Sequence, residues 1–119
     1  MEQDFVSRGG AVLFAGGIGN SGAVCGAVVG AVMAIGLKRG RAETMEGMLD
    51  ELAVAAEFRR RFEAEVGDIS CRDLTGADLS TTEGVEAYMS SDTPMMVCFP
   101  AVAMAYRLAV DLLRESSSS

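Results

Sequence analysis

The chain has 119 residues, half of them apolar, with a formal net charge of −7 and no histidine. This length fits one domain with a sizeable core, and the negative charge opposes binding to phosphate backbones, so we expect no nucleic-acid partner. The lack of histidine excludes Ser-His-Asp and Cys-His catalytic arrangements within the chain and removes the commonest zinc ligand.

The cysteine count and the N-terminal part of the chain indicate where the protein is located. Three cysteines are too few for a disulfide-stapled secreted scaffold, and the acidic start, residues 1–4, does not resemble a secretory signal. The uncharged stretch 9–37 has the length of a membrane span, but a polar glycine loop interrupts it at residues 16–21. The part after this loop has the length of a buried core helix. We therefore expect a cytoplasmic protein with no membrane insertion.

The predicted elements begin with a short helix over residues 4–15, which ends in the glycine loop. Asn20 or Ser21 is expected to cap the next helix, residues 22–37. Glycines recur at four-residue spacing along that helix and predict a smooth stripe that another helix can approach closely: Gly22, Gly26 and Gly30.

The longest predicted helix covers residues 44–66 and stops at Gly67. Within it, the basic run 59–61 is interpreted as a solvated face, with an anchor for an acidic partner as the alternative. The apolar face of this helix is expected to carry residues at helical spacing: Met45, Met48, Leu49, Leu52, Ala55, Ala56, Phe62 and Val66.

Three shorter features complete the prediction. Asp68 is expected to cap a turn over residues 69–74, which Gly76 closes. A capping box at residues 80–83 opens a helix that reaches Met89. The final helix is expected to begin near Pro100, because proline is favoured in a first turn. Its inward residues are predicted to be Val102, Tyr106, Ala109, Val110 and Leu113.

Together these elements predict an all-α fold, a small helical bundle of about five helices joined by Gly-rich and short loops. Residues 1–115 would form a single helical domain, and residues 116–119 a disordered serine tail. A surface rich in Gly, Ala and Met would leave apolar area to cover, so we expect a homodimer.

The glycine loop also matches the GxGxxG pattern of dinucleotide-binding turns, at residues 17–22. That fold needs a second strand after the helix, ending in an acidic residue that binds the ribose. Here a basic segment, residues 37–41, and another helical pattern follow instead. Tight turning and close packing are the preferred interpretation of the glycines, and nucleotide binding is the alternative.

The cysteines share a predicted position. Cys25 falls in the first turn of one helix, Cys71 lies three residues after the cap at Asp68, and Cys98 precedes Pro100. A thiol at a helix N-terminus tends to have a lowered pKa, which suits a nucleophile or a metal ligand. Cysteine is also a common buried apolar residue, so the inert interpretation stays open for each of the three.

The sequence resembles a known family at these cysteines. Residues 25–30 read CGAxxG within a Gly/Ala-rich helix that ends in Gly-Leu-Lys, residues 71–76 read CRDLxG, and Cys98 precedes an apolar helix. This combination resembles the redox-active C_GCAxxG_C_C family over residues 16–113. The resemblance implies a small helical protein whose cysteines are redox-active or bind metal. Related domains in split-Soret-type cytochromes extend that implication to an iron–sulfur cluster held by cysteines.

On this resemblance, Cys25, Cys71 and Cys98 are the candidate redox thiols or metal ligands, with Cys25 and Cys71 as the core pair and Cys98 as the third ligand or resolving thiol. Gly26 and Gly30 are the close-packing positions beside the site. Arg72 would stabilise the negative charge of the thiols. The family pattern has four cysteines, and no cysteine precedes Cys25 here, so one chain lacks the thiolates for a four-cysteine cluster.

The expected function is thus a cytoplasmic cysteine-based redox or metal-binding protein. Its cofactor would be an iron–sulfur cluster or another metal, or none, and its redox partner is unknown. The alternative from another class is a non-catalytic helical interaction or scaffold module with inert cysteines.

Overall fold

A computed structural model of the chain describes residues 15–40 and 42–117. That part is all-α, as predicted, with one isolated antiparallel bridge between Val24 and Ser70 as its only β-type pairing. The predicted helix over residues 4–15 lies outside the described residues except for Ala15, which is in a turn. The helices in chain order are α2 (Gly26–Arg39), α3 (Met45–Val66), α4 (Cys71–Thr75), α5 (Thr82–Met89), the π-helical turn η2 (Pro94–Cys98) and α6 (Phe99–Ser117).

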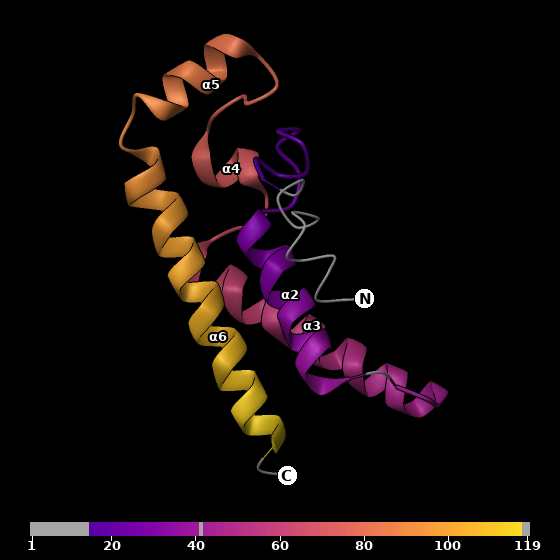
Figure 1. The fold of residues 1–119 in the computed structure, drawn as a ribbon. Coiled ribbons are helices and arrows are strands. Elements are labelled where there is room, and N and C mark those ends of the chain that lie inside the picture. The colour runs from indigo at the N-terminus through magenta and orange to yellow at the C-terminus, as the bar shows by residue number, and fades with distance from the viewer. Residues whose placement is uncertain (1–14, 41, 118–119) are drawn as a thin grey trace.

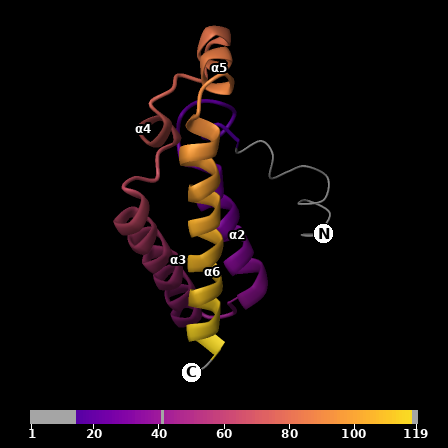
Figure 2. The same cartoon turned by 90° about the vertical axis from the view of Figure 1, so that its left-hand side faces the viewer.

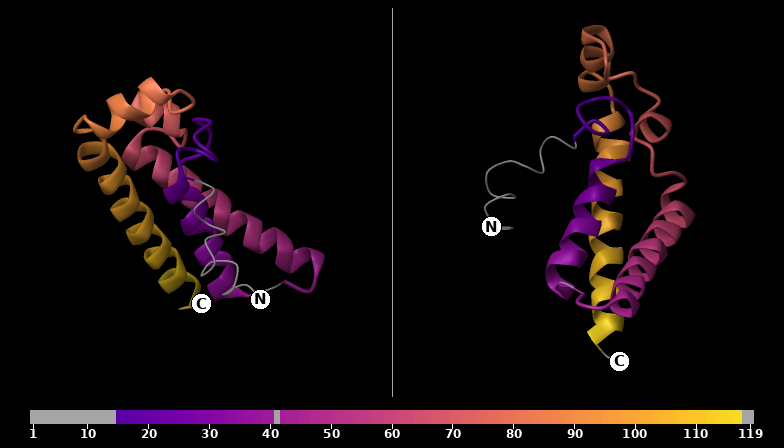
Figure 3. Two further views of the ribbon diagram at one scale, coloured as in Figure 1. Left: turned by 45° about the horizontal axis from the view of Figure 1, so that its top comes forward. Right: turned by 90° about the vertical axis from the view of Figure 1, so that its right-hand side faces the viewer.

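The body of the molecule is formed by α2, α3 and α6, which all pack against one another, with α6 along one side of α2 and α3 (Figures 1, 2 and 3). Helices α4 and α5 sit beyond one end of this body, where α6 begins (Figure 1). The core is a single apolar cluster with contributions from all three long helices: Val28, Ala31, Ile35, Phe58, Phe62, Ala101, Ala105, Leu108, Ala109 and Leu112.

Helix α3 confirms its predicted limits. The hydroxyl of Thr44 accepts a hydrogen bond from the Gly47 N–H at 2.9 Å, and Gly67 ends the helix with a positive φ of 111°. Phe58 and Phe62 are both fully buried, with stacked rings whose centroids lie 6.0 Å apart. Phe58 was absent from the predicted apolar face, although it lies one turn before Phe62 on the same side of the helix.

The first half of α3 corrects that predicted face. Met45, Met48, Leu49 and Leu52 are all exposed, at 67%, 44%, 58% and 58%. This end of α3 extends away from α6 and the rest of the body (Figures 1 and 3). Helical spacing identifies an apolar stripe, but it does not say how far along the stripe a partner helix reaches.

Helix α2 begins later than predicted. Its N-cap is Cys25, and the predicted cap Ser21 instead donates its hydroxyl to the Gly17 carbonyl at 2.6 Å. The reason lies in the preceding backbone, where Gly22 has a left-handed φ of 77° and is not helical. The stripe of three glycines is therefore wrong, because Gly22 belongs to the loop.

The caps of the two short helices also differ by position. Ser70 rather than Asp68 caps α4, and Thr81 rather than Ser80 caps α5 through a bond from the Gly84 N–H. Asp68 instead accepts from the Ile69 and Ser70 N–H groups just before α4. The predicted stops at Gly76 and after Met89 are confirmed.

The last helical segment starts earlier than predicted. The proline of the first turn is Pro94, and the chain passes through the π-helical turn η2 directly into α6. Pro100 lies inside this continuous run, immediately after the turn. A π-turn loosens the regular hydrogen-bond ladder, so the missing N–H of an internal proline is tolerated there. Cys98 consequently lies within a helical run rather than at a helix N-terminus.

The buried face of α6 agrees only in part with the predicted one. Ala109 is buried and Leu113 packs against the core, as predicted, but Val102 and Tyr106 are 55% and 72% exposed. Ala101, Ala105 and Leu108 are buried in their place. Small alanines bring α6 close to α2, and the larger residues turn outward. Helix α6 reaches Ser117, two residues into the predicted serine tail.

Membrane-crossing potential also lies in the last helical run. In the part of the chain that the structure describes, the segment Pro94–Glu115 is long and apolar enough to cross a membrane, by length and composition alone. The same segment supplies half of the buried cluster of the body. A helix that forms part of a protein core meets the same criteria of length and composition.

Candidate functional site: a cysteine cluster

Two of the three cysteines are brought together by backbone pairing. The Cys25 N–H donates to the Ile69 carbonyl at 2.6 Å, and the Cys71 N–H donates to the Ala23 carbonyl at 2.7 Å. These bonds flank the antiparallel bridge between Val24 and Ser70. Because both cysteines follow the bridged residues by one position, they lie on the same side of this pairing. Segments 46 residues apart in sequence thus place their thiols near each other.

The glycine loop forms one wall of this arrangement. A Cβ at Gly17 would lie 2.8 Å from the Cβ of Cys71, and a Cβ at Gly22 would lie 2.9 Å from the Cβ of Arg72. Both glycines also have left-handed φ angles, 73° and 77°. Close backbone approach to α4 is therefore what requires glycine at these two positions.

The loop does not present its amides as a phosphate-binding turn does. The Gly22 N–H donates to the Gly16 carbonyl and the Ala23 N–H to the Gly17 carbonyl, while the Asn20 N–H donates to Ala15. These bonds use groups that a phosphate would need, and no strand follows in the described part of the chain. The arrangement favours the packing interpretation of the GxGxxG match.

Cys98 joins the cluster from the opposite side, on η2, which packs against α4. Its sulfur lies 2.9 Å from the hydroxyl oxygen of Tyr88, which reaches it from α5. Both residues are half-buried. The sequence did not identify Tyr88 as a site residue. Its contact with Cys98 depends on the turn between α5 and η2, and no motif in the sequence predicts the direction of that turn.

The electrostatics indicate that the three thiols share one site. The pKa of Cys71 is raised, first by burial, then by the charges of Cys25 and Cys98, while a hydrogen bond from Thr75 acts in the opposite direction. The pKa of Tyr88 is raised by burial, by the hydrogen bond with Cys98, and by the charges of all three cysteines. The expectation of a lowered pKa is wrong for Cys71, because desolvation of the thiolate dominates there.

The remaining predicted site residues lie around this cluster. Gly26 is the first residue of α2, directly after Cys25. Gly30 lies one turn further along α2, in an apolar groove between α2 and α6, where a Cβ would point into open space. The predicted close-packing role is therefore wrong for Gly30. Arg72 is exposed, and its charge acts on Asp78, whose pKa is lowered first by hydrogen bonds from Ser80.

The cluster does not fit the metal centre that the resemblance implies. All three cysteines are unbonded and half-buried, and they supply one thiolate fewer than the usual set of four that holds an iron–sulfur cluster. Among the described residues, no three His, Cys, Asp or Glu side chains form a group that could hold a metal ion.

Comparison with known proteins agrees with the sequence pattern. No curated protein and no solved structure matches the chain. One family profile does, over residues 6–112, with the description "Putative redox-active protein (C_GCAxxG_C_C)". The match spans most of the 119 residues and includes the whole cysteine cluster. The chain belongs to the redox-active C_GCAxxG_C_C family.

Proposed function

We propose that the protein is a thiol–disulfide redox protein in which Cys98 attacks and Cys71 resolves. The observation that carries this proposal is the convergence of three cysteines and Tyr88 from four separate segments at one end of the fold. The family's redox character supports the same chemistry.

The role of Cys98 follows from its contact with Tyr88. A raised pKa keeps the phenol protonated, so its O–H can donate to the sulfur when Cys98 is a thiolate. The thiolate is the attacking form of cysteine. Burial raises the pKa of Cys71, which favours its neutral thiol form until the mixed disulfide at Cys98 has formed.

A disulfide substrate is the oxidant in the proposed reaction. The Cys98 thiolate attacks one substrate sulfur, the substrate S–S bond breaks, and the leaving sulfur departs with the electron pair and takes a proton from solvent. The Cys71 thiol then loses its proton and attacks Cys98, which forms the Cys71–Cys98 disulfide and releases the second substrate thiol. Two cysteine thiols are oxidised and one disulfide is reduced. Cys25, beside Cys71, can accept the new bond by exchange.

Redox titration tests this proposal. The reduced protein would be equilibrated with glutathione buffers of stepped potential, and its free thiols counted by mass spectrometry after alkylation. A two-electron transition that yields an intramolecular disulfide is expected, and Cys98→Ser should abolish attack on a substrate disulfide. The scaffold module with inert cysteines would be favoured by a different result. In that case all three thiols would stay reduced at every buffer potential, and their exchange with glutathione disulfide would be no faster in the folded protein than in urea.

The metal-binding alternative within the family has its own measurement. Protein prepared without oxygen would be analysed for iron and zinc by mass spectrometry. We expect less than one metal per chain, because the described donors form no metal-binding group. One iron or zinc ion or more per chain would contradict the dithiol proposal. It would indicate a metal centre with ligands in addition to the three cysteines.

Two further proposals concern the location of the protein and its oligomeric state. We propose a cytoplasmic location, where reducing conditions keep thiols free. We also propose a homodimer, supported by the apolar side chains of Val102 and Tyr106 that α6 leaves exposed. Sedimentation analysis of Val102→Glu against the parent protein tests the dimer.

A further inference from the structure

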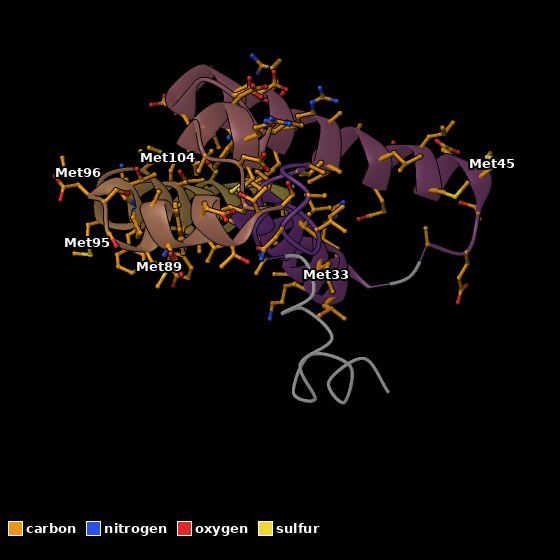
Figure 4. All side chains as sticks on the ribbon, turned by 90° about the horizontal axis from the view of Figure 1, so that it is seen from above. Met33, Met45, Met89, Met95, Met96 and Met104 are labelled. Carbon is orange, nitrogen blue, oxygen red and sulfur yellow. The ribbon has the colours of Figure 1, made fainter. Side chains whose placement is uncertain are left out.

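The corner between α5 and η2 carries an exposed apolar surface beside Cys98. Met89, Met95, Met96 and Phe99 are 69%, 64%, 71% and 59% exposed. We call these four residues the methionine surface. The three methionines lie together at one end of the molecule, opposite Met45 (Figure 4). Tyr88 directly precedes Met89, Cys98 directly precedes Phe99, and the Tyr88 and Cys98 side chains contact each other, so this surface lies next to the proposed attacking thiol.

Charge is distributed unevenly around this surface. Between Arg72 and Arg107 the chain has five acidic residues and no basic one, whereas the rest has twelve acidic and ten basic residues. The segment therefore contributes −5 of the net −7. The acidic residues of the segment are all exposed: Asp73, Asp78, Glu83, Glu86 and Asp92.

These carboxylates have no basic counterpart in the described part of the chain. The ion pairs there involve Arg39, Arg59, Arg60 and Arg61, all on α2 or α3, with partners outside the acidic segment. The longer-range charge of Arg72 reaches Asp78. Glu83, Glu86 and Asp92 form an unneutralised acidic rim on α5 and the loop that follows it.

We propose that the methionine surface and its acidic rim dock a protein partner that presents a disulfide flanked by apolar and basic residues. This inference rests on the proposed thiol chemistry and names the class of its substrate. Methionine packs adaptably against apolar side chains, and unneutralised charge of one sign steers oppositely charged partners to the surface.

The same charge argues against other occupants. Two copies of the chain would bring two acidic rims together, and like charges across an interface oppose association. Anionic lipids and nucleic acids are repelled for the same reason. A homodimer would therefore use the part of α6 beyond Phe99, around Val102 and Tyr106.

Two peptide probes test this inference on the full-length protein. Each carries one cysteine as a mixed disulfide with 5-thio-2-nitrobenzoate, flanked by leucines and then by lysines in one peptide and glutamates in the other. Attack by Cys98 forms a peptide–Cys98 disulfide and releases the coloured thiolate. At about 0.01 M salt, where the screening length is about 30 Å, we expect the lysine peptide to react at least about tenfold faster. At about 1 M salt the two rates should converge.

Matched charge variants locate the effect. Glu83→Gln, Glu86→Gln and Asp92→Asn together should reduce the rate preference towards unity. The control Glu43→Gln, Glu46→Gln and Asp50→Asn changes the net charge equally at the far end of α3 and should retain the preference. Glu46 matches Glu83 in lying in the first turn of its helix.

Each outcome has a distinct meaning. Equal rates for both peptides at low salt, or equal loss of preference in the two triple variants, would overturn the docking proposal while Cys98 still reacts. No release of thiolate with either peptide would overturn the proposed function itself. Met96→Gln should also slow both peptides by severalfold at high salt, with Met45→Gln as its exposed control, and unchanged rates would remove the methionines from the docking surface.

Discussion

The helical body and the cysteine end of this molecule differ in what fills them. In the body, fully buried phenylalanines and alanines pack α2, α3 and α6 together, and the arginines of α3 are paired with glutamates. At the cysteine end, residues 70–98, Leu79 is buried but the other side chains are half-buried or exposed. The acidic residues there lack ion pairs with described bases, and the charges of Cys25 and Cys98 act on Cys71. We infer from this difference that the body supplies the stability, while the cysteine end holds polar groups and thiols that remain partly accessible to solvent.

The largest expected effect breaks the body. Phe58→Ala removes a fully buried ring and its stacked contact with Phe62, so the free energy of unfolding should fall by about 3–5 kcal/mol. Met89→Ala, at a 69% exposed position of the cysteine end, should change it by less than about 0.5 kcal/mol. Urea unfolding followed by circular dichroism measures both values. Similar losses for the two variants would contradict the division of roles.

A smaller effect separates reactivity from stability at the cysteine end. Tyr88→Phe removes the hydroxyl that lies 2.9 Å from the Cys98 sulfur and that can donate to the thiolate, so the rate of alkylation of Cys98 should fall about tenfold, which corresponds to about 1.4 kcal/mol. Tyr106→Phe changes the other tyrosine, exposed on α6, and should leave that rate unchanged. Mass spectrometry of iodoacetamide-treated protein follows Cys98 alone. An undiminished rate in Tyr88→Phe would remove Tyr88 from the site.

The pKa of Cys71 gives a prediction in pH. Because burial raises this pKa in the folded state, the unfolded chain loses the proton first as the pH rises. The contribution of Cys71 to stability is therefore complete below the unfolded pKa and is lost as the pH rises through the folded pKa. The difference in urea midpoint between the parent protein and Cys71→Ser should shrink or change sign over that interval. A difference that does not depend on pH would contradict the burial of this thiol.

The smallest effect concerns the charged face of the body. Arg60 and Arg61 hold the pKa of Glu57 down at about 2, so Glu57 stays ionised until strongly acidic pH. This stabilisation is present above the unfolded pKa and is lost as the pH falls through the folded one. Because these groups are exposed, Glu57→Gln should lower Tm by at most a few degrees at neutral pH. A drop as large as that of Phe58→Ala would overturn the view that apolar packing, and not ion pairing, stabilises the body.

Sequence reasoning predicted most helix limits but fewer of the contacts between helices. Thr44, Gly67 and Gly76 act through their own local backbone, so their roles could be inferred directly. Which face of α6 is buried depends on how closely α2 approaches. Ala101 and Ala105 allow this close approach, but the sequence does not show which residues of the two helices face each other. The start of the last helical run was misplaced because Pro100, a normal helix breaker, is accommodated by a π-helical turn.

The candidate site divides in the same way. The three cysteines could be selected from their number and from the family pattern, and the glycine loop from its composition. Their convergence depends on one isolated β-bridge and on the turn between α5 and η2. Tyr88 became visible only through that turn, and the raised pKa of Cys71 only through its burial.

Disulfide mapping is the most direct test of the gathered thiols. Reduced monomer at low concentration would be oxidised with glutathione disulfide, alkylated without reduction, and its peptides identified by mass spectrometry. We predict an intramolecular bond from Cys71 to Cys98 or, after exchange, to Cys25. Cysteines that form only bonds between chains, or mixed disulfides with glutathione that no second cysteine resolves, would mean that these sulfurs do not act as one site.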